Sequence, residues 1–332
     1  MDNFGVGITG VGSFVPENIM TNKDLEEIVD TSNEWIMERT GIEERRIAEK
    51  GIATSDLSSI AAQRAMTDAD VSPDEIDLIL VATITGDHIC PSTACMVQTQ
   101  IGAINAAAFD LNAGCTGFIY ALSTAKAFVK SGIYKKVLVI GAETLSTIVN
   151  WKDRNTCVLF GDGAGAAIVE ACEEGYGILA EELGSDGTKG DVLIVPAGGS
   201  RQPTSKETVD AGLNFISMDG REVFKFAVRI MEKTSKSVLD KAGVKAEDLD
   251  LLIPHQANIR IIDSASKKLG LTSDKVFVNL NRYGNMSAAS IPVALDEALK
   301  SKRIKKGQNV LLVAFGAGLT WGGSLLKWNR EE

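Results

Sequence analysis

The stretch Val71-Ser-Pro-Asp-Glu-Ile-Asp-Leu-Ile-Leu80 decides the fold, because it recurs later in the chain as Val244-Lys-Ala-Glu-Asp-Leu-Asp-Leu-Leu-Ile253. Each copy runs from a turn into a short apolar segment that is typical of a buried strand. A second pair of matching segments, 109–115 and 278–285, comes next, and each is followed by residues that we expect to form an apolar helix. This ordered repeat predicts two similar halves, residues 1–172 and 173–332.

The apolar segments predict the fold class. Short continuous apolar runs alternate with helical segments, which is typical of mainly parallel sheets covered by helices; the runs are 78–82, 137–140, 251–253 and 310–314. The class is therefore α/β, and two such halves packed helix against helix would form a layered sandwich. Its site would lie where strand ends of both halves converge. Between 182 and 220, Gly, Ser, Pro and charged residues interrupt the pattern and predict surface loops over a cleft.

Composition excludes several classes of protein. Of 332 residues, 45% are hydrophobic and 23% are charged, and no apolar run approaches the roughly 20 residues needed to span a bilayer. The net charge of −10 argues against general binding of nucleic acid. Residues 1–30 lack the pattern of a secretory signal, so the expected location is the cytoplasm. Five cysteines favour free thiols, and two histidines without metal-ligand spacing make a metal site unexpected.

Cys115 is the first candidate for chemistry. It follows an apolar strand predicted at 106–110 and a tight turn with Asn112 and Gly114, and it directly precedes an apolar helix that ends near Gly132. Backbone N–H groups and the helix dipole at such a position favour a thiolate and are expected to lower the thiol pKa. This arrangement is typical of an activated nucleophile. The residues alone also allow a small buried thiol without function.

Three further segments could complete a site with Cys115. His255, in Pro254-His-Gln-Ala-Asn258, follows the strand predicted at 251–253, where α/β proteins place functional residues. Asn285 occupies the place of Cys115 in the second half, and its amide could donate to an oxyanion or simply cap a turn. Residues 315–322 place glycines after a buried strand, which suits either a backbone oxyanion hole or a plain turn.

Residues 160–166 formally match a dinucleotide-binding fingerprint through Gly161, Gly163 and Ala166. That motif requires a helix directly after the glycines and an acidic residue at the end of the next strand. The sequence supplies neither, because Glu173-Glu-Gly175 interrupts the segment too soon. We therefore expect no nicotinamide cofactor, and an oxidoreductase is a weak alternative.

Taken together, the segments around Cys115, His255 and Asn285 resemble the β-ketoacyl-[acyl-carrier-protein] (ACP) synthase III family of fatty acid biosynthesis, within the thiolase-like superfamily. The resemblance covers essentially the whole chain and includes residues 30–36, 39–42, 160–166, 254–258, 284–290 and 315–322. It implies a thiolase-like α-β-α-β-α sandwich and a homodimer.

The resemblance also implies a reaction and its residues. Cys115 would take an acyl group from acyl-CoA, with the amides of Cys115 and Ala317 holding the oxyanion. His255 and Asn285 would bind the thioester carbonyl of malonyl-ACP and stabilise the enolate that decarboxylation releases. Attack of this carbanion on the acyl-cysteine gives a β-ketoacyl-ACP without any metal or redox cofactor. One alternative is a related synthase of a polyketide or quinolone pathway with another acceptor; another is a non-catalytic module that binds acyl-CoA or a carrier protein.

Substrate-binding residues follow from the same resemblance. Trp35, Arg39 and Arg154 would bind CoA, with the ring of Trp35 and the guanidinium of Arg154 stacking on the adenine. Lys225, Arg260, Lys267 and Lys268 would dock the acidic ACP, although a solvated helix face is the alternative for them. Cys90 stands where the family usually has a phenylalanine that lines the partner's acyl pocket, so we expect a longer or reshaped pocket. Met286 also departs from the small polar residue that is more common beside the asparagine.

Overall fold

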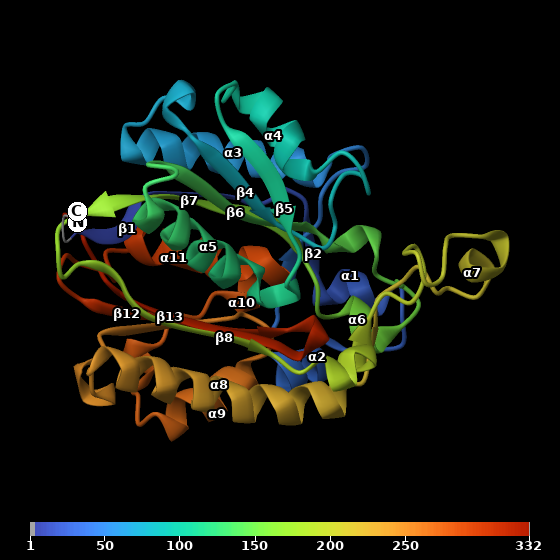
Figure 1. Ribbon diagram of the computed structural model, residues 1–332. Helices are drawn as coiled ribbons and strands as arrows, with labels where there is room; N and C mark the ends of the chain where they lie inside the picture. Colours follow the sequence, from blue (N-terminus) through green and yellow to red (C-terminus); the bar gives the residue numbers. More distant parts are fainter. Residues whose placement is uncertain (1–3, 332) are drawn as a thin grey trace.

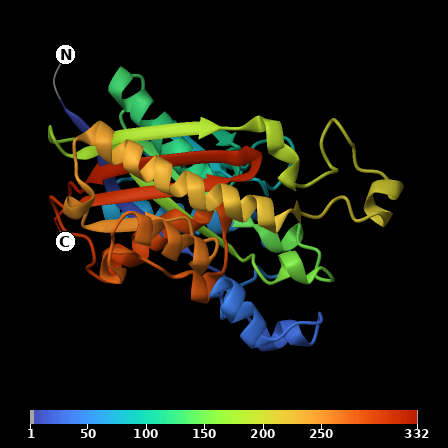
Figure 2. The ribbon, with the colours of Figure 1, turned by 90° about the horizontal axis from the view of Figure 1, so that it is seen from below.

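The computed structural model describes residues 4–331 and arranges them in alternating layers of helix and sheet (Figure 1). Helices α3 (Thr54–Ala69) and α4 (Thr93–Ile101) cover the outer face of the upper sheet. Helices α5 (Gly117–Ser131) and α11 (Ser290–Lys300) lie between the two sheets. Helices α8 (Gly220–Ala242) and α9 (Ile259–Lys268) cover the outer face of the lower sheet (Figure 2). The layered sandwich predicted from the repeat is therefore the fold.

The two sheets share one topology. The upper sheet has the order β1-β7-β6-β4-β5 and the lower sheet, read from its other edge, the order β8-β13-β12-β11. The strands are β1 (Gly5–Phe14), β4 (Leu78–Ala82), β5 (Ala107–Leu111), β6 (Val137–Thr144), β7 (Asp162–Cys172), β8 (Gly177–Ser185), β11 (Leu251–Pro254), β12 (Asn309–Gly316) and β13 (Thr320–Lys327). An isolated parallel bridge from Leu252 to Val276 stands where β5 lies in the upper sheet. The chain passes from one sheet to the other between Cys172 and Gly177.

The prediction of mainly parallel sheets was wrong. In each sheet one side pairs in parallel, as β5-β4-β6 and β11-β12, but the remaining pairings are antiparallel. The connection from β12 to β13 is only residues 317–319, far too short for the crossover that a parallel neighbour requires. The missed strands are rich in Gly, Ala and Ser, so they lack the continuous apolar runs on which the prediction rested.

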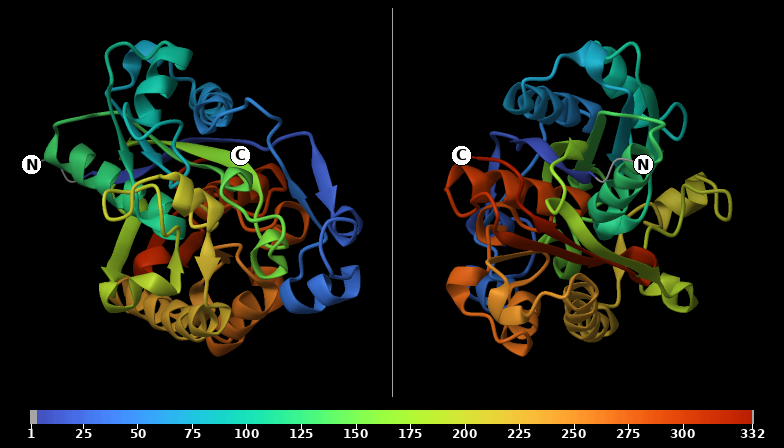
Figure 3. Two further views of the ribbon diagram at one scale, coloured as in Figure 1. Left: turned by 90° about the vertical axis from the view of Figure 1, so that its right-hand side faces the viewer. Right: turned by 60° about the vertical axis from the view of Figure 1, so that its left-hand side comes forward.

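The smaller elements gather at one end of the layers, at the right of Figure 1 and facing the viewer in Figure 3 (left), whereas the described chain ends lie at the other. They are β2 (Ile19–Thr21), α1 (Asn22–Glu26), α2 (Asn33–Thr40), β3 (Glu44–Arg46), α6 (Arg154–Cys157), β9 (Leu193–Ile194), α7 (Lys206–Asp210) and β10 (Ser217–Met218). The short helix α10 (Leu280–Tyr283) lies nearer the middle of the molecule. The segment with α7 projects from the body (Figure 1). It is the irregular region expected between 182 and 220, although it also forms the short β9–β10 ladder.

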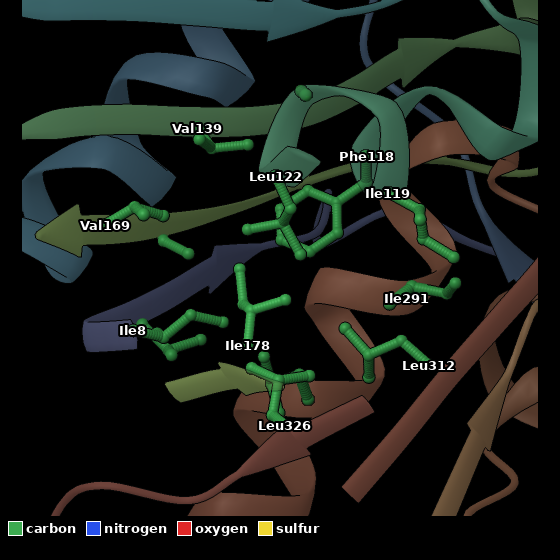
Figure 4. Close-up of a cluster of buried hydrophobic side chains, with 14 of the residues drawn as sticks. Ile8, Phe118, Ile119, Leu122, Val139, Val169, Ile178, Ile291, Leu312 and Leu326 are labelled. Atoms are coloured by element: carbon green, nitrogen blue, oxygen red, sulfur yellow. The ribbon is translucent and has the colours of Figure 1, made fainter. Parts of the chain in front are cut away.

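Apolar side chains fill the space between the sheets (Figure 4). Helices α5 and α11 contribute Phe118, Ile119, Leu122 and Ile291, which pack with Ile8, Val139 and Val169 of the upper sheet and Ile178, Leu312 and Leu326 of the lower sheet. Burial of each such side chain stabilises the fold by about 1.5–3 kcal/mol. This layer therefore fixes the distance between the halves, and with it the relative positions of their strand ends.

One close approach links a sheet directly to a turn of the other half. Gly141 of β6 faces the backbone of residues 287–289, and a Cβ atom at Gly141 would lie 2.2 Å from the carbonyl oxygen of Ala288. No real Cβ atom comes that close to a backbone oxygen. The turn can therefore lie on β6 only because residue 141 has no side chain.

We predict that Gly141→Ala lowers the free energy of unfolding by about 1–3 kcal/mol, because the turn must shift to admit the methyl group. Urea unfolding monitored by circular dichroism measures the change. Gly187→Ala is the matched control, because a Cβ atom there meets nothing within 4 Å, and it should change stability by less than about 0.5 kcal/mol. Equal stability of the two variants would contradict the close approach.

Candidate active site

Three turns from distant parts of the chain bring the predicted residues together. Cys115 lies in the 3₁₀ turn η2 (Gly114–Thr116) directly before α5, and His255 directly follows β11. Asn285 lies between α10 and the 3₁₀ turn η7 (Ser287–Ala289). All three side chains line a single cleft, together with Ala317 of η8 (Ala317–Leu319). The structure thus assembles the cysteine, histidine and asparagine that the sequence analysis selected.

The Cys115 thiol is less acidic than its position at a helix start led us to expect. Burial raises its pKa to about 11, and the negative charge of Glu143 acts in the same direction. The Ser287 hydroxyl and the amides of Cys115 and Ala317 lower the pKa, but they do not offset burial. The expectation of a lowered pKa was therefore wrong.

The amides of Cys115 and Ala317 both lie beside the thiol. They can do so because β12 ends in Gly316, where a Cβ atom would stand 2.6 Å from the Cys115 nitrogen. Two residues after Gly316, Gly318 has a φ of 73°, and this conformation turns the chain back sharply into β13. Two backbone donors therefore converge on one point, as an oxyanion hole requires.

His255 is buried without any polar partner. Its exposed fraction is 1%, and neither ring nitrogen forms a hydrogen bond with another described residue. Its ring meets Phe315 edge to face at 5.5 Å between centroids. Burial lowers the pKa of the imidazole to about 3, so the ring is neutral near neutral pH. A neutral imidazole with two unused nitrogens at a cleft can offer a hydrogen bond to a ligand.

Gln256 holds the turn that carries His255, a role that the sequence analysis did not assign. Its Nε2 donates to the carbonyl oxygens of Pro254 (2.8 Å) and Phe277 (3.1 Å). Its Oε1 accepts from the amides of Asn279 (3.0 Å) and Leu280 (3.2 Å). The side chain is fully buried, so these bonds are not exchanged with water. They fix the backbone of the histidine against the chain segment that leads to Asn285.

Hydrogen bonds hold both the side chain and the backbone of Asn285. Its Oδ1 accepts a hydrogen bond from the Ser287 amide (2.8 Å), which leaves Nδ2 as the end of the side chain that can donate to a ligand. Its backbone pairs with Leu159 and Gly161. Gly161 thus supports the backbone of Asn285. Met286 turns away, and its sulfur would lie 2.7 Å from a Cβ atom at Gly163, so the sulfur takes the place of a side chain there.

Most of the remaining wall of the cleft is apolar. Ile84 and Leu145 come from the ends of the upper sheet, whereas Leu193, Ile216 and Met218 come from the irregular segment between 182 and 220. The segment expected to cover a cleft therefore does line one. An aliphatic group would be accepted here, because it would meet apolar side chains in place of water.

A second hollow continues the cleft to the surface. Trp35, Arg39, Lys225 and Arg260 line it, and it shares Leu159, Met218, Gly220, Phe224 and Asn258 with the cleft. Two guanidinium groups lie over the ring of Trp35, at 5.4 Å for Arg39 and 5.2 Å for Arg154. Arg221 also lines this hollow, and the sequence analysis did not select it.

The four cations predicted to form one patch do not lie together. Lys225 and Arg260 both line the outer hollow, where Lys225 pairs with Glu222 at 2.8 Å and Arg260 lies over the ring of Phe224 at 5.5 Å. Lys267 and Lys268 are about two helical turns further along α9. Lys267 lines a separate groove, and Lys268 pairs with Glu232 at 2.8 Å. The expected single cluster is therefore reduced to Lys225 and Arg260, with Arg221 beside them.

Cys90 lies outside the cleft of its own chain. It is exposed, in the loop between β4 and α4, next to Ile89, whose exposed fraction is 96%. The sequence predicts that Cys90 lines the acyl pocket of a partner chain. That role stays a prediction, because it concerns a second chain.

Comparison with known proteins places the chain in a family. Two family models, described as 3-oxoacyl-[acyl-carrier-protein (ACP)] synthase III and its C-terminal part, match residues 109–187 and 239–328. A β-ketoacyl-[acyl-carrier-protein] synthase III of Caldanaerobacter subterraneus is 59% identical over 329 residues, covering 99% of each chain. The chain belongs to the β-ketoacyl-ACP synthase III family. This confirms the resemblance found in the sequence.

Solved structures of the synthase III family agree with the fold. The crystal structure of 3-oxoacyl-[acyl-carrier-protein] synthase III from Aquifex aeolicus is 50% identical and matches with a TM-score of 0.90, covering 98% of this chain and all of the other. A priming β-ketosynthase of the R1128 polyketide biosynthetic pathway is 36% identical, with a TM-score of 0.92 over 100% of this chain and 98% of its own. The thiolase-like sandwich is thus common to relatives that serve different pathways.

Proposed function

We propose that this synthase III catalyses the decarboxylative condensation of an acyl-CoA primer with malonyl-ACP and so initiates fatty acid synthesis. The single observation that carries the proposal is the convergence of Cys115, His255 and Asn285 on one apolar-walled cleft that continues to a cationic hollow. Each of the three offers a different function: a nucleophile, a neutral imidazole and an oriented amide. The names of its relatives point to the same reaction.

The first half of the proposed reaction loads the primer. The Cys115 sulfur attacks the thioester carbonyl of acyl-CoA, and the amides of Cys115 and Ala317 hold the oxygen as it becomes negative. The acyl chain lies against the apolar wall, and CoA leaves through the outer hollow. The result is an acyl-Cys115 thioester.

The second half forms the carbon–carbon bond. His255 and Asn285 donate hydrogen bonds to the thioester carbonyl of malonyl-ACP, and this oxygen carries the negative charge once CO₂ departs. The carbanion attacks the acyl-Cys115 carbonyl and releases a β-ketoacyl-ACP. Because loss of CO₂ generates the nucleophile, the proposed reaction requires neither a metal nor a redox cofactor.

Two surfaces would receive the substrates. We propose that Trp35, Arg39 and Arg154 bind the nucleotide of CoA, since a ring flanked by guanidinium groups suits a purine and its phosphates. Lys225 and Arg260 at the same entrance would attract the acidic ACP, with Lys267 and Lys268 further along α9. The net charge of −10 makes such local cations necessary for an acidic partner.

The second candidate function keeps the fold and Cys115 but uses another acceptor. The 36% identical priming β-ketosynthase of a polyketide pathway favours this alternative, because its fold matches the whole of this chain. The acceptor distinguishes the two: malonyl-ACP of fatty acid synthesis for the first, and a pathway-specific acceptor for the second.

We further propose a cytoplasmic enzyme. The cysteines are free thiols, which suits a reducing compartment. Within residues 4–331, no helix is both long and apolar enough to cross a membrane.

A homodimer is proposed from the edge of the upper sheet. β5 is the last strand in that sheet, and Phe109 on it is exposed. Ile104, just before β5, and Ile89, in the loop between β4 and α4, have exposed fractions of 80% and 96%. An unpaired strand with exposed apolar residues is a ready surface for pairing with a second chain.

The loading step is tested by the intact mass of the protein after incubation with a panel of straight and branched acyl-CoAs. We expect an acyl adduct on Cys115 that malonyl-ACP discharges, and none on Cys115→Ala. His255→Ala and Asn285→Ala should still form the adduct but decarboxylate malonyl-ACP at least about a hundredfold more slowly, as for loss of an oxyanion donor. An adduct that malonyl-ACP leaves in place would favour the alternative acceptor. Absence of any adduct would exclude catalysis through Cys115.

The two substrate surfaces are tested by a pair of variants that serve as controls for each other. Trp35→Ala should raise the KM for acyl-CoA about 2- to 10-fold, the value of a lost aromatic stack, and leave the KM for malonyl-ACP unchanged. Arg260→Glu should raise the KM for malonyl-ACP more than the KM for acyl-CoA, because it repels an acidic partner and leaves the ring of Trp35 in place. Steady-state kinetics with each substrate varied in turn measures both effects. Equal effects on both substrates would argue against separate surfaces.

The dimer is tested by sedimentation equilibrium at micromolar concentration. We expect twice the chain mass of 35.4 kDa for the wild type. Phe109→Asp places a charge on the exposed face of β5 and should shift the equilibrium toward the single chain. A wild type that sediments as one chain would contradict the proposed pairing.

A further inference from the structure

A buried carboxyl group stands behind the cleft without a role in the proposed reaction. Glu143 lies in β6, and its exposed fraction is 0%. Thr85 Oγ1 donates to its Oε2 (2.5 Å), as does Thr83 Oγ1 (3.2 Å), and the Ile84 amide reaches both oxygens (3.3 and 3.2 Å). A carboxyl group is costly to bury, and this one is held in a fixed orientation by neutral donors alone.

Ser287 stands between this carboxyl and Cys115. Its Oγ is buried and forms no hydrogen bond of good geometry with another described residue. It nevertheless lies close enough to interact with both the Cys115 thiol and the Glu143 carboxyl. Its backbone is held at a φ of 46°, a left-handed conformation that a serine rarely adopts. Such strained positions cluster at functional sites.

We propose that Ser287 and Glu143 form a proton relay for Cys115: the Ser287 hydroxyl connects the thiol to the Glu143 carboxylate, which holds the thiol proton while the cysteine is acylated. This proposal rests on the proposed function and adds a proton acceptor to it. Ser287 is then a catalytic residue, because its hydroxyl takes up the thiol proton, and Glu143 is the proton acceptor behind it. His255 shares the cleft, but neither of its ring nitrogens bonds to another described residue, and we assign it to the malonyl step.

The relay balances over one turnover. As the sulfur–acyl bond forms, the thiol proton passes to Ser287 Oγ and the Ser287 proton passes to Glu143. The bond between the acyl group and CoA breaks with its electron pair on the CoA sulfur, and this sulfur takes a proton from solvent. On condensation, the electron pair of the bond to CO₂ forms the new carbon–carbon bond. The sulfur–acyl bond then breaks with its pair on Cys115, which takes the proton back from Glu143 through Ser287.

The electrostatics suit a proton acceptor. Burial raises the pKa of Glu143 to about 7, and the Thr85 hydroxyl and Ile84 amide oppose this. Residues 83–85 and 287–289, which face the carboxyl from β4 and η7, carry no charged side chain. Cys115 is the titratable group that faces it from η2, and His255 shares the cleft. Asp162, near the facing Gly163 on β7, is bonded instead to Ala48 and Ser146. The acceptor form of Glu143 therefore forms as the pH rises through about 7.

The test is the rate of acyl-Cys115 formation from acyl-CoA, followed by rapid quench and intact mass between pH 5.5 and 9. In the wild type the rate should rise through about pH 7 and level off, as Glu143 loses its proton. Glu143→Gln should be slower by about a hundredfold at pH 7.5, a typical value for loss of a general base. Its rate should keep rising to pH 9, because only ionisation of the thiol remains. Ser287→Ala should show the same rate and pH dependence as Glu143→Gln. Glu143→Asp should acylate faster than Glu143→Gln but more slowly than the wild type.

Two controls separate a relay from a structural role. Asp162→Asn changes another fully buried carboxyl, on the neighbouring strand, and should keep the wild-type pH profile. Decarboxylation of malonyl-ACP in the absence of primer should fall far less than acylation in Ser287→Ala, since the backbone amide of Ser287, and not its hydroxyl, holds Asn285.

The outcomes are distinct. If Glu143→Gln and Ser287→Ala acylate at the wild-type rate and with the wild-type pH profile, the relay is wrong. The proposed function still stands in that case, because the acyl-Cys115 adduct forms. A parallel loss of acylation and decarboxylation without a change of profile would assign both residues a structural role and overturn the relay. A wild type that forms no adduct would overturn the proposed function and the relay together. Circular dichroism confirms folding, and Ser287→Ala decides the question if Glu143→Gln does not fold.

Discussion

Direct contact between backbone turns is the constraint on which the rest of this structure depends. The turns that carry Cys115, Ala317 and the Asn285–Ser287 segment come from distant parts of the chain and touch with no side chain between them. A Cβ atom at Gly316 would stand 2.6 Å from the Cys115 nitrogen, and one at Gly141 would stand 2.2 Å from the Ala288 carbonyl oxygen. Backbone has no rotamers, so turns packed in this way position their side chains more rigidly than side-chain packing alone would. The apolar layer of α5 and α11 holds the two sheets at the distance that this contact requires (Figure 4).

The internal repeat explains why so much of the fold could be predicted from one sequence. Matching turn-to-strand segments fixed the places of β4 and β11, and the glycine-flanked helix after Cys115 is α5, capped by Gly132. Because a repeated fold brings equivalent strand ends to one axis, the pairing of Cys115 with Asn285 followed from the repeat itself. His255 could be predicted because it follows a segment that reads as a buried strand. In the structure it directly follows the buried strand β11.

The errors have a common physical cause, which is that local patterns do not record tertiary burial. Helices approach β7 at Gly165 and β13 at Gly323 so closely that only glycine fits, and these glycines interrupt the apolar run that marks a strand. The thiol pKa was predicted from the helix start alone, whereas the surrounding protein removes the water that would stabilise a thiolate. Glu143 and Ser287 are ordinary residues in sequence, and only the contact between β6 and η7 sets them behind Cys115. Helix spacing places cations on one face but does not record their partners, such as Glu232 for Lys268.

Burial drives the groups of this site toward their neutral forms, and this affects the second substrate most. The Cys115 thiol has a pKa of about 11 and the His255 imidazole a pKa of about 3, so neither carries a charge near neutral pH. The described residues that line the cleft include no lysine or arginine, so cations are confined to the outer hollow. In the proposed reaction, a malonyl carboxylate that passes the outer hollow therefore leaves water without gaining an ion pair. Loss of CO₂ removes that uncompensated charge and moves the electron pair to the thioester oxygen, where His255 and Asn285 can bind it. The low polarity that raises the pKa of the Cys115 thiol would thus also favour decarboxylation over retention of the malonyl carboxylate.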